Sequence, residues 1–129
     1  MIRVIYTDKA PKPIGPYSQG LCVNGWIYVS GQLPIDPKTG ELVEGDFKRR
    51  TAQVLENVKS ILEATGASLE NIVKVTVYLK NINQIKELNE VYSEFFKDYN
   101  PARSIVEVSN LPRGADLEID IVAYKESCV

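Results

Sequence analysis

Residues 72–80 read Ile-Val-Lys-Val-Thr-Val-Tyr-Leu-Lys, and this stretch decides the fold class. The segment is rich in β-branched residues, and after its first residue apolar side chains alternate with polar ones. Such a period of two is typical of a strand with one face towards a core. The sequence therefore predicts a β-strand that places Val73, Val75, Val77 and Leu79 on one face.

Amphipathic helices are predicted on both sides of this strand. Over residues 47–65 the apolar side chains recur at helical spacing, and Gly66 can adopt the left-handed conformation that ends a helix. A second apolar stripe follows over residues 85–96, with Asn83 as its predicted N-cap. This helix must end before Pro101, because the residue that precedes a proline is forced out of the helical region.

Further strands are predicted towards both ends of the chain. The turn Asn24-Gly25 tolerates positive φ at both positions and predicts a hairpin between residues 20–23 and 26–30. The other predicted strands are residues 3–6, 103–108 and 117–124. The order β-β-β-α-β-α-β-β predicts one α+β domain over residues 1–129, in which two helices pack on one face of a single mixed sheet.

The opposite face of this sheet has no predicted cover. In the last strand Glu118, Asp120, Val122 and Tyr124 alternate with the apolar residues of the core side. An uncovered face that carries Val and Tyr beside acidic groups indicates association with copies of the same chain.

The composition excludes several kinds of site. The chain has no histidine, which rules out Ser-His-Asp and Cys-His triads and His-ligated zinc. A net charge of −2 provides no bulk positive field for nucleic acid or anionic lipid, so neither partner is expected. The acidic residues show no metal-ligand pattern, so no metal site is expected from them.

The cysteines and the N-terminus indicate location. Cys22 and Cys128 form no CxxC pair and no disulfide framework, so we expect two unpaired thiols in a reducing compartment. The N-terminal residues lack the apolar core of a signal peptide, and no apolar stretch approaches the ~20 residues that span a bilayer. The sequence therefore predicts a cytoplasmic protein without a membrane partner.

Two residues are candidates for chemistry. Arg103 follows Pro101-Ala102 at the start of a strand, where its guanidinium could clamp a carboxylate with two hydrogen bonds; the alternative is an edge arginine paired with Glu or Asp. Glu118 lies on the uncovered face, where desolvation at an interface would raise its pKa and make it a proton acceptor for water. The alternative is a solvated strand glutamate.

Two further residues could line a pocket. Tyr17, which follows a proline-rich loop, could donate a hydrogen bond to a ligand, although filling the core is the favoured interpretation. Gly31 permits close approach of a ligand to the backbone but equally suits a plain bend. These residues by themselves support an acid-binding pocket and no more specific activity.

Residues 101–124 closely resemble the C-terminal signature of the RidA family, also called YjgF/YER057c/UK114. The resemblance covers nearly the whole chain in order. Shorter similar runs are residues 10–11, 14–20, 30–34, 37–41, 57–59, 72–74 and the aromatic positions of 92–96.

This resemblance implies a chorismate-mutase-like protomer that assembles as a homotrimer with a ligand cleft at each subunit interface. Typical members hydrolyse reactive enamines and imines, such as 2-aminoacrylate and 2-iminobutanoate, to 2-oxo acids and ammonia without a cofactor or metal. By resemblance, Arg103 clamps the substrate carboxylate and Glu118 activates the attacking water, while Tyr17, Gly31 and Asn89 line the pocket.

One position departs from many close relatives. Ile105 stands where they have cysteine, so any role of a thiol is lost, whereas substrate contacts through its main chain remain available. The leading hypothesis is an imine deaminase, and the alternative is a non-catalytic trimeric module that binds 2-oxo acids or acts as a chaperone-like partner. RNA cleavage or translation inhibition, attributed to some relatives, is disfavoured by the acidic pI of about 5.2.

Overall fold

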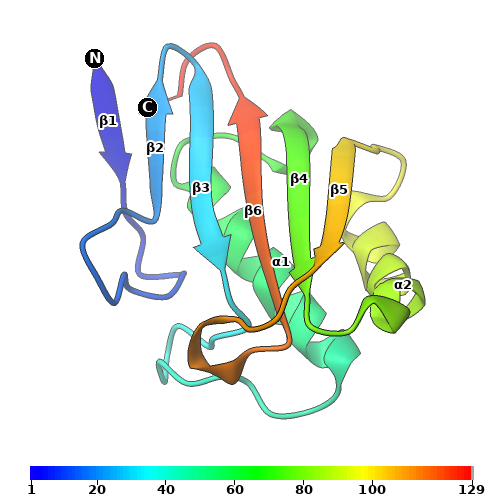
Figure 1. Cartoon of the computed structure of the whole chain (residues 1–129). Helices are drawn as coiled ribbons and strands as arrows, with labels where there is room; N and C mark the ends of the chain where they lie inside the picture. The colour runs from blue at the N-terminus through cyan, green and yellow to red at the C-terminus, as the bar shows by residue number, and fades with distance from the viewer. Residues whose placement is uncertain (129) are drawn as a thin grey trace.

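The computed structural model describes residues 1–128, and its strands form one six-stranded sheet in the order β1-β2-β3-β6-β4-β5 (Figure 1). Neighbouring strands are antiparallel except β4 and β5, which run parallel. The strand bounds are β1 Ile2–Ile5, β2 Gly20–Val23, β3 Trp26–Gln32, β4 Ile72–Leu79, β5 Ala102–Glu107 and β6 Leu117–Tyr124. The predicted single mixed sheet and element order are confirmed.

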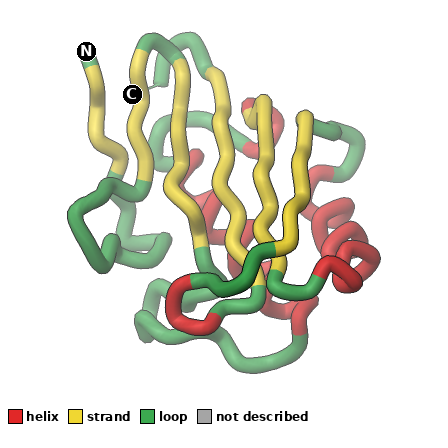
Figure 2. Tube along the Cα trace, viewed as in Figure 1, coloured by secondary structure: helices red, strands yellow, loops and turns green. Residues whose placement is uncertain are grey.

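Two helices, α1 (Phe47–Glu63) and α2 (Ile85–Phe96), lie on the same face of the sheet (Figures 1 and 2). The Asp46 side chain caps α1 by accepting a hydrogen bond from the Arg49 backbone N–H at 2.9 Å. Gly66, at φ 84°, has the predicted left-handed conformation shortly after the helix ends. The predicted two-helix layer is therefore confirmed.

The predicted N-cap of α2 is wrong. A 3₁₀ turn, Ile82–Gln84, precedes the helix and places Gln84 rather than Asn83 at its cap position. Asn81 caps this turn instead, because its side chain accepts a hydrogen bond from the Asn83 backbone N–H at 3.0 Å. The extra turn moves the capping residue two positions towards the N-terminus.

Strand β4 supplies the centre of the core, with one correction to its predicted face. Val75, Val77 and Leu79 are fully buried, as expected, but Val73 is 42% exposed. A shift in the pairing of β4 with β6 between Ile72 and Lys74 causes the difference, and Ile72 takes the buried position. A local bulge thus changes which residue faces the core.

The other face of the sheet is uncovered in the described chain, as Figure 2 shows for the side away from the helices. In β6, residues Leu117, Ile119, Ile121 and Ala123 are buried, whereas the residues between them are not. Tyr28 on β3 is an exposed aromatic residue of the uncovered face. This face offers apolar surface beside the acidic groups of β6.

The prediction of two unpaired thiols is wrong, because Cys22 and Cys128 form a disulfide. Strand β2 lies beside β3, and the chain that leaves β6 returns past the β2–β3 turn, where the Lys125 N–H donates to the Gly25 carbonyl at 2.8 Å. The two Cα atoms are thereby brought to 6.3 Å. The cysteines no longer support an inference about a reducing compartment.

Within residues 1–128, no helix is both long and apolar enough to cross a membrane.

Candidate functional site

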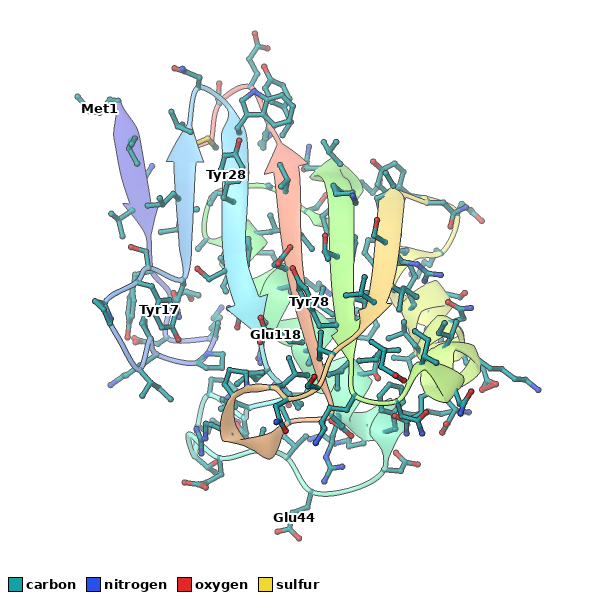
Figure 3. The ribbon with its side chains drawn as sticks, in the orientation of Figure 1. Met1, Tyr17, Tyr28, Glu44, Tyr78 and Glu118 are labelled. Atoms are coloured by element: carbon teal, nitrogen blue, oxygen red, sulfur yellow. A yellow bond between two sulfur atoms is a disulfide. The ribbon has the colours of Figure 1, made fainter. Side chains whose placement is uncertain are left out.

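A cavity of about 500 Å³ opens where the proline-rich loop meets the end of β3 and the start of β6. Tyr17, Gly31 and Glu118 all line it, and we call these three residues the cavity group. Figure 3 shows Tyr17 on the loop beside the sheet and Glu118 on β6. The volume lies in the range of small-molecule sites. Tyr17 is 52% exposed, so the prediction that it fills the core is wrong.

Gly31 lies against the carboxylate of Glu118. The pairing of β3 with β6 shifts between Val29 and Gln32, so that Ser30 and Gly31 together oppose a single residue of β6. This bulge brings the backbone of β3 onto Glu118, and a Cβ atom at Gly31 would lie 2.7 Å from its Cδ. Glycine is therefore required for the observed position of the carboxylate, and the reading of a plain bend is replaced by a close approach.

Glu118 itself is partly buried rather than fully solvated. Burial raises the pKa of its carboxyl above the ordinary value, and the negative charge of Asp120 raises it further. A carboxylate whose pKa is raised is a better proton acceptor for a bound water.

Gln19 holds the loop that forms one wall of the cavity, a role that the sequence did not reveal. Only 1% of this residue is exposed. Its side-chain oxygen accepts from the Thr7 N–H at 2.7 Å, and its nitrogen donates to the carbonyls of Thr7, Ala10 and Pro11 at 3.0, 3.3 and 2.9 Å. These bonds fix a segment in which prolines have removed the backbone donors. A polar residue before a strand carries no periodic signal that predicts such burial.

Two cations, Lys12 and Arg113, also line the cavity. Arg113 has a left-handed backbone, at φ 61°, and its guanidinium donates to the Gly40 carbonyl at 2.9 Å. The same guanidinium lies 3.6 Å from the Glu41 carboxylate. Arg113 thus connects the turn before β6 to the loop after β3.

Arg103 lies at the other end of the sheet, on the edge strand β5. Its Nη1 donates to Oδ1 of Asn89 on α2 at 2.8 Å, and its guanidinium carbon lies 4.7 Å from the centre of the Tyr92 ring. Within residues 1–128 its hydrogen-bonded partner is thus a neutral amide, not the carboxylate of the alternative interpretation. Ile105 follows on the same face of β5, and we call Arg103, Asn89 and Ile105 the edge group.

Within one chain, the cavity group and the edge group do not lie next to each other. Strand β4 separates β6 from β5 in the sheet. Arg103 pairs with the buried Val75 and so faces the helices, whereas Glu118 pairs with Tyr78 on the uncovered face. The cavity group can hold and deprotonate a water, and the edge group can bind a carboxylate. A cavity group and an edge group can act on the same ligand molecule only if they belong to different copies of the chain.

Within residues 1–128, no three His, Cys, Asp or Glu side chains gather closely enough to hold a metal ion.

Comparison with known proteins gives consistent matches. Residues 7–125 match the family described as Endoribonuclease L-PSP. A RutC family protein of Pyrococcus abyssi is 58% identical, covering 96% of this chain and 98% of the relative. The human 2-iminobutanoate/2-iminopropanoate deaminase is 46% identical, covering 95% and 90%.

The fold also matches solved structures. The crystal structure of E. coli TdcF with bound serine superposes with a TM-score of 0.91 at 40% identity, covering 95% of this chain and 98% of that one. Since the family match spans most of the chain and several relatives exceed 40% identity, the resemblance noted in the sequence is confirmed. The chain belongs to the Endoribonuclease L-PSP family, known also as the YjgF or RidA family.

Proposed function

We propose that the protein hydrolyses 2-imino acids and their enamine tautomers to 2-oxo acids and ammonia. The observation that carries the proposal is the complementary pair of groups: a carboxylate with a raised pKa in a cavity, and a preoriented guanidinium free of a carboxylate partner within residues 1–128. The human relative is named for this activity, and the TdcF crystal contains a small amino acid. Both names support the substrate class.

The proposed site lies between copies of the chain. The cavity group of one copy would meet the edge group of the next, which is a head-to-tail contact that closes into a ring. The exposed strand β5 and the uncovered sheet face supply the surface for such a contact. A homotrimer and a cytoplasmic location belong to the proposal, the first from the family resemblance and the second from the sequence.

The geometry suggests the following chemistry. The Arg103 guanidinium binds the substrate carboxylate through the N–H groups that Asn89 leaves free, which places the C=N carbon near Glu118. Glu118 takes a proton from water as the water oxygen bonds to that carbon, and it returns this proton to the nitrogen, which gives a carbinolamine. Glu118 then takes the hydroxyl proton and passes it to the nitrogen, the C–N bond breaks, and ammonia leaves as the C=O bond of the 2-oxo acid forms. An enamine enters the same route after protonation at carbon.

Two other functions remain as outcomes of the test. A binding module would retain 2-oxo acids without accelerating hydrolysis. An endoribonuclease is suggested by the description of the family. We do not favour it, because the net charge of −2 provides no general attraction for the phosphate backbone.

The test generates 2-iminobutanoate or 2-aminoacrylate in situ with threonine or serine dehydratase and follows release of the 2-oxo acid. We expect the purified protein to raise the rate above the spontaneous one in proportion to its concentration. Calorimetric binding of 2-oxobutanoate with no rate increase would indicate the binding module. Cleavage of a labelled RNA without imine hydrolysis would indicate the endoribonuclease, and either result would refute the proposal.

Replacing Gly31 with alanine is expected to lower kcat by about 10-fold or more, because the new Cβ must push the Glu118 carboxylate out of its place. The cavity leaves room for that movement, so the free energy of unfolding should change by less than about 1 kcal/mol. The measurements are steady-state kinetics and urea unfolding. Unchanged kcat in Gly31→Ala would contradict the proposed role of the contact.

A further inference from the structure

A second acidic residue lies beside Glu118 on the uncovered face. Asp120 follows two positions later in β6, so both side chains leave the same face of the strand, with Cα atoms about 7 Å apart. The Tyr78 hydroxyl of β4 donates to Oδ2 of Asp120 at 2.9 Å. Tyr78 is itself the residue that pairs across the strands with Glu118. Figure 3 shows Tyr78 and Glu118 close together in the lower half of the sheet.

These contacts hold Glu118 between two strands. The Gly31 backbone of β3 lies against its carboxylate from one side, and Tyr78 of β4 lies on the other. The bulge in β3 places Ser30 and Gly31 opposite Asp120, so the same irregularity that brings β3 onto Glu118 is centred on its acidic neighbour. Asp120 is thus held by the Tyr78 hydroxyl and lies opposite the β3 bulge.

We propose that Asp120, held in place by the Tyr78 hydroxyl, is a positioning residue that acts on Glu118 from the same face of β6 and supports its use as a proton acceptor and donor. The inference rests on the proposed function and names a residue pair that acts through Glu118. Neither residue needs to touch the substrate.

The electrostatics agree with this geometry. The hydrogen bond to Asp120 is the main cause that raises the pKa of Tyr78, with smaller contributions from burial and from the charges of Asp120 and Glu118. Its hydroxyl therefore stays protonated at neutral pH and acts as a donor. After burial, Asp120 is the charge that raises the pKa of Glu118. An adjacent negative charge stabilises the protonated form of Glu118 and makes its carboxylate the stronger base.

Other charged or titratable groups share the surroundings of Glu118 and must be included. They are Lys12 and Tyr17 of the proline-rich loop and Arg113 of the turn before β6, which line the cavity, and Lys74 of β4, which pairs with Val122 on the same face as Asp120. Arg113 is engaged by the Gly40 carbonyl and the Glu41 carboxylate. Burial and, after it, the charge of Asp120 are the causes that raise the pKa of Glu118.

The pair matters because the proposed reaction uses Glu118 twice. It must accept a proton from water and then give one to the departing nitrogen, and both steps are efficient when its pKa lies near the working pH. A carboxyl with an ordinary pKa would accept the proton less readily. If the hydrogen bond between Tyr78 and Asp120 served only to hold the strands together, its loss would leave the pKa of Glu118 unchanged. A measurement of this pKa therefore distinguishes a positioning role from a structural one.

The test is a titration of the full chain with ¹³C-labelled glutamate side chains, in which NMR follows the carboxyl carbon of Glu118. Asp120→Asn is expected to lower the midpoint of Glu118 by about half a pH unit or more, since it removes a neighbouring negative charge while keeping the shape. Asp98→Asn makes the same change of charge in the exposed segment after α2 and is expected to leave the midpoint unchanged. Equal midpoints in the two variants would overturn the proposal.

A second variant covers the case in which Asp120→Asn does not fold. Tyr78→Phe removes only the hydroxyl and should lower the Glu118 midpoint by a smaller amount, because the released Asp120 side chain turns away. No change in either folded variant would refute a role for the pair. The titration needs no substrate, so it decides the coupling even if the wild type shows no deaminase activity, a result that refutes the proposed function separately.

Kinetics complete the test in an active protein. The acid limb of kcat/KM reports the ionisation of the free enzyme's base, so Asp120→Asn should move it to lower pH by the same amount as the NMR midpoint. A fall in rate at every pH without movement of the limb would show a merely structural role and would overturn the assignment.

Discussion

Mixing Arg103→Ala subunits with Glu118→Gln subunits is expected to restore imine hydrolysis that neither variant shows alone. The structure separates the two groups by strand β4 and turns them to opposite faces of the sheet. In a mixed ring, a Glu118→Gln copy contributes an intact Arg103 to a neighbour that retains Glu118. After random exchange of equal amounts, about one quarter of the interfaces have both groups.

The single variants should fail in different ways. Loss of Glu118 removes the base and should lower kcat by about 100-fold or more, since general base catalysis contributes on this scale. Loss of Arg103 removes the bidentate contact with the carboxylate and should raise KM as well as lower kcat/KM. The measurement is steady-state kinetics in the dehydratase-coupled assay, with each protein assayed before and after mixing.

The control and the assembly are checked separately. Glu56→Gln changes an exposed glutamate on α1 and is expected to keep wild-type kinetics. Native mass spectrometry establishes whether subunits have exchanged, and light scattering establishes whether the mass exceeds the 14.4 kDa of one chain. Proven exchange without recovered activity would contradict a site shared between copies, and a monomer with full activity would contradict it more directly.

Reducing the Cys22–Cys128 disulfide is expected to lower the free energy of unfolding by about 4 kcal/mol. The bond joins residues 106 positions apart, so it closes nearly the whole chain into one loop and removes much of the entropy of the unfolded state. The measurement is urea unfolding with and without a reductant. The midpoint concentration should fall on reduction, and the slope should rise, because the unfolded chain without the cross-link is less compact and exposes more surface.

The Cys128→Ser variant separates this effect from other actions of the reductant. It should unfold at the midpoint of the reduced wild type and should not respond to the reductant. Because Cys128 belongs to the tail after β6 and to neither group of the site, activity under native conditions should stay at the wild-type level. Equal stability of oxidised and reduced wild type would show that the bond contributes nothing to the fold.

Sequence patterns predicted what depends on local periodicity and turn chemistry. The alternation in residues 72–80 and the helical stripes on both sides led to the correct elements, and Asn24-Gly25 led to the hairpin. Errors arose at local irregularities: a bulge changed the register at Val73, and a 3₁₀ turn moved the cap away from Asn83. Neither a bulge nor a short 3₁₀ turn leaves a periodic signal.

Contacts between distant segments could not be predicted in this way. The pairing of Cys22 with Cys128 depends on the strand order, which places β2 near the path of the C-terminal tail. The bond between Tyr78 and Asp120 depends on the neighbouring positions of β4 and β6. The roles proposed for Arg103 and Glu118 came from family resemblance, since their spacing alone favoured ordinary structural explanations.

The parallel pairing of β4 and β5 has a consequence for how substrate preference can change. Both strands and the helix between them belong to one continuous β-α-β unit over residues 72–107, and this unit contains the whole edge group. The cavity group comes from the loop, β3 and β6, which lie outside it. The two proposed roles, acid recognition and water delivery, are thus encoded in separate stretches of the gene. Exchange of the β-α-β unit between relatives could therefore transfer a substrate preference, including any effect of Ile105, without changing the cavity group that is proposed to carry out hydrolysis.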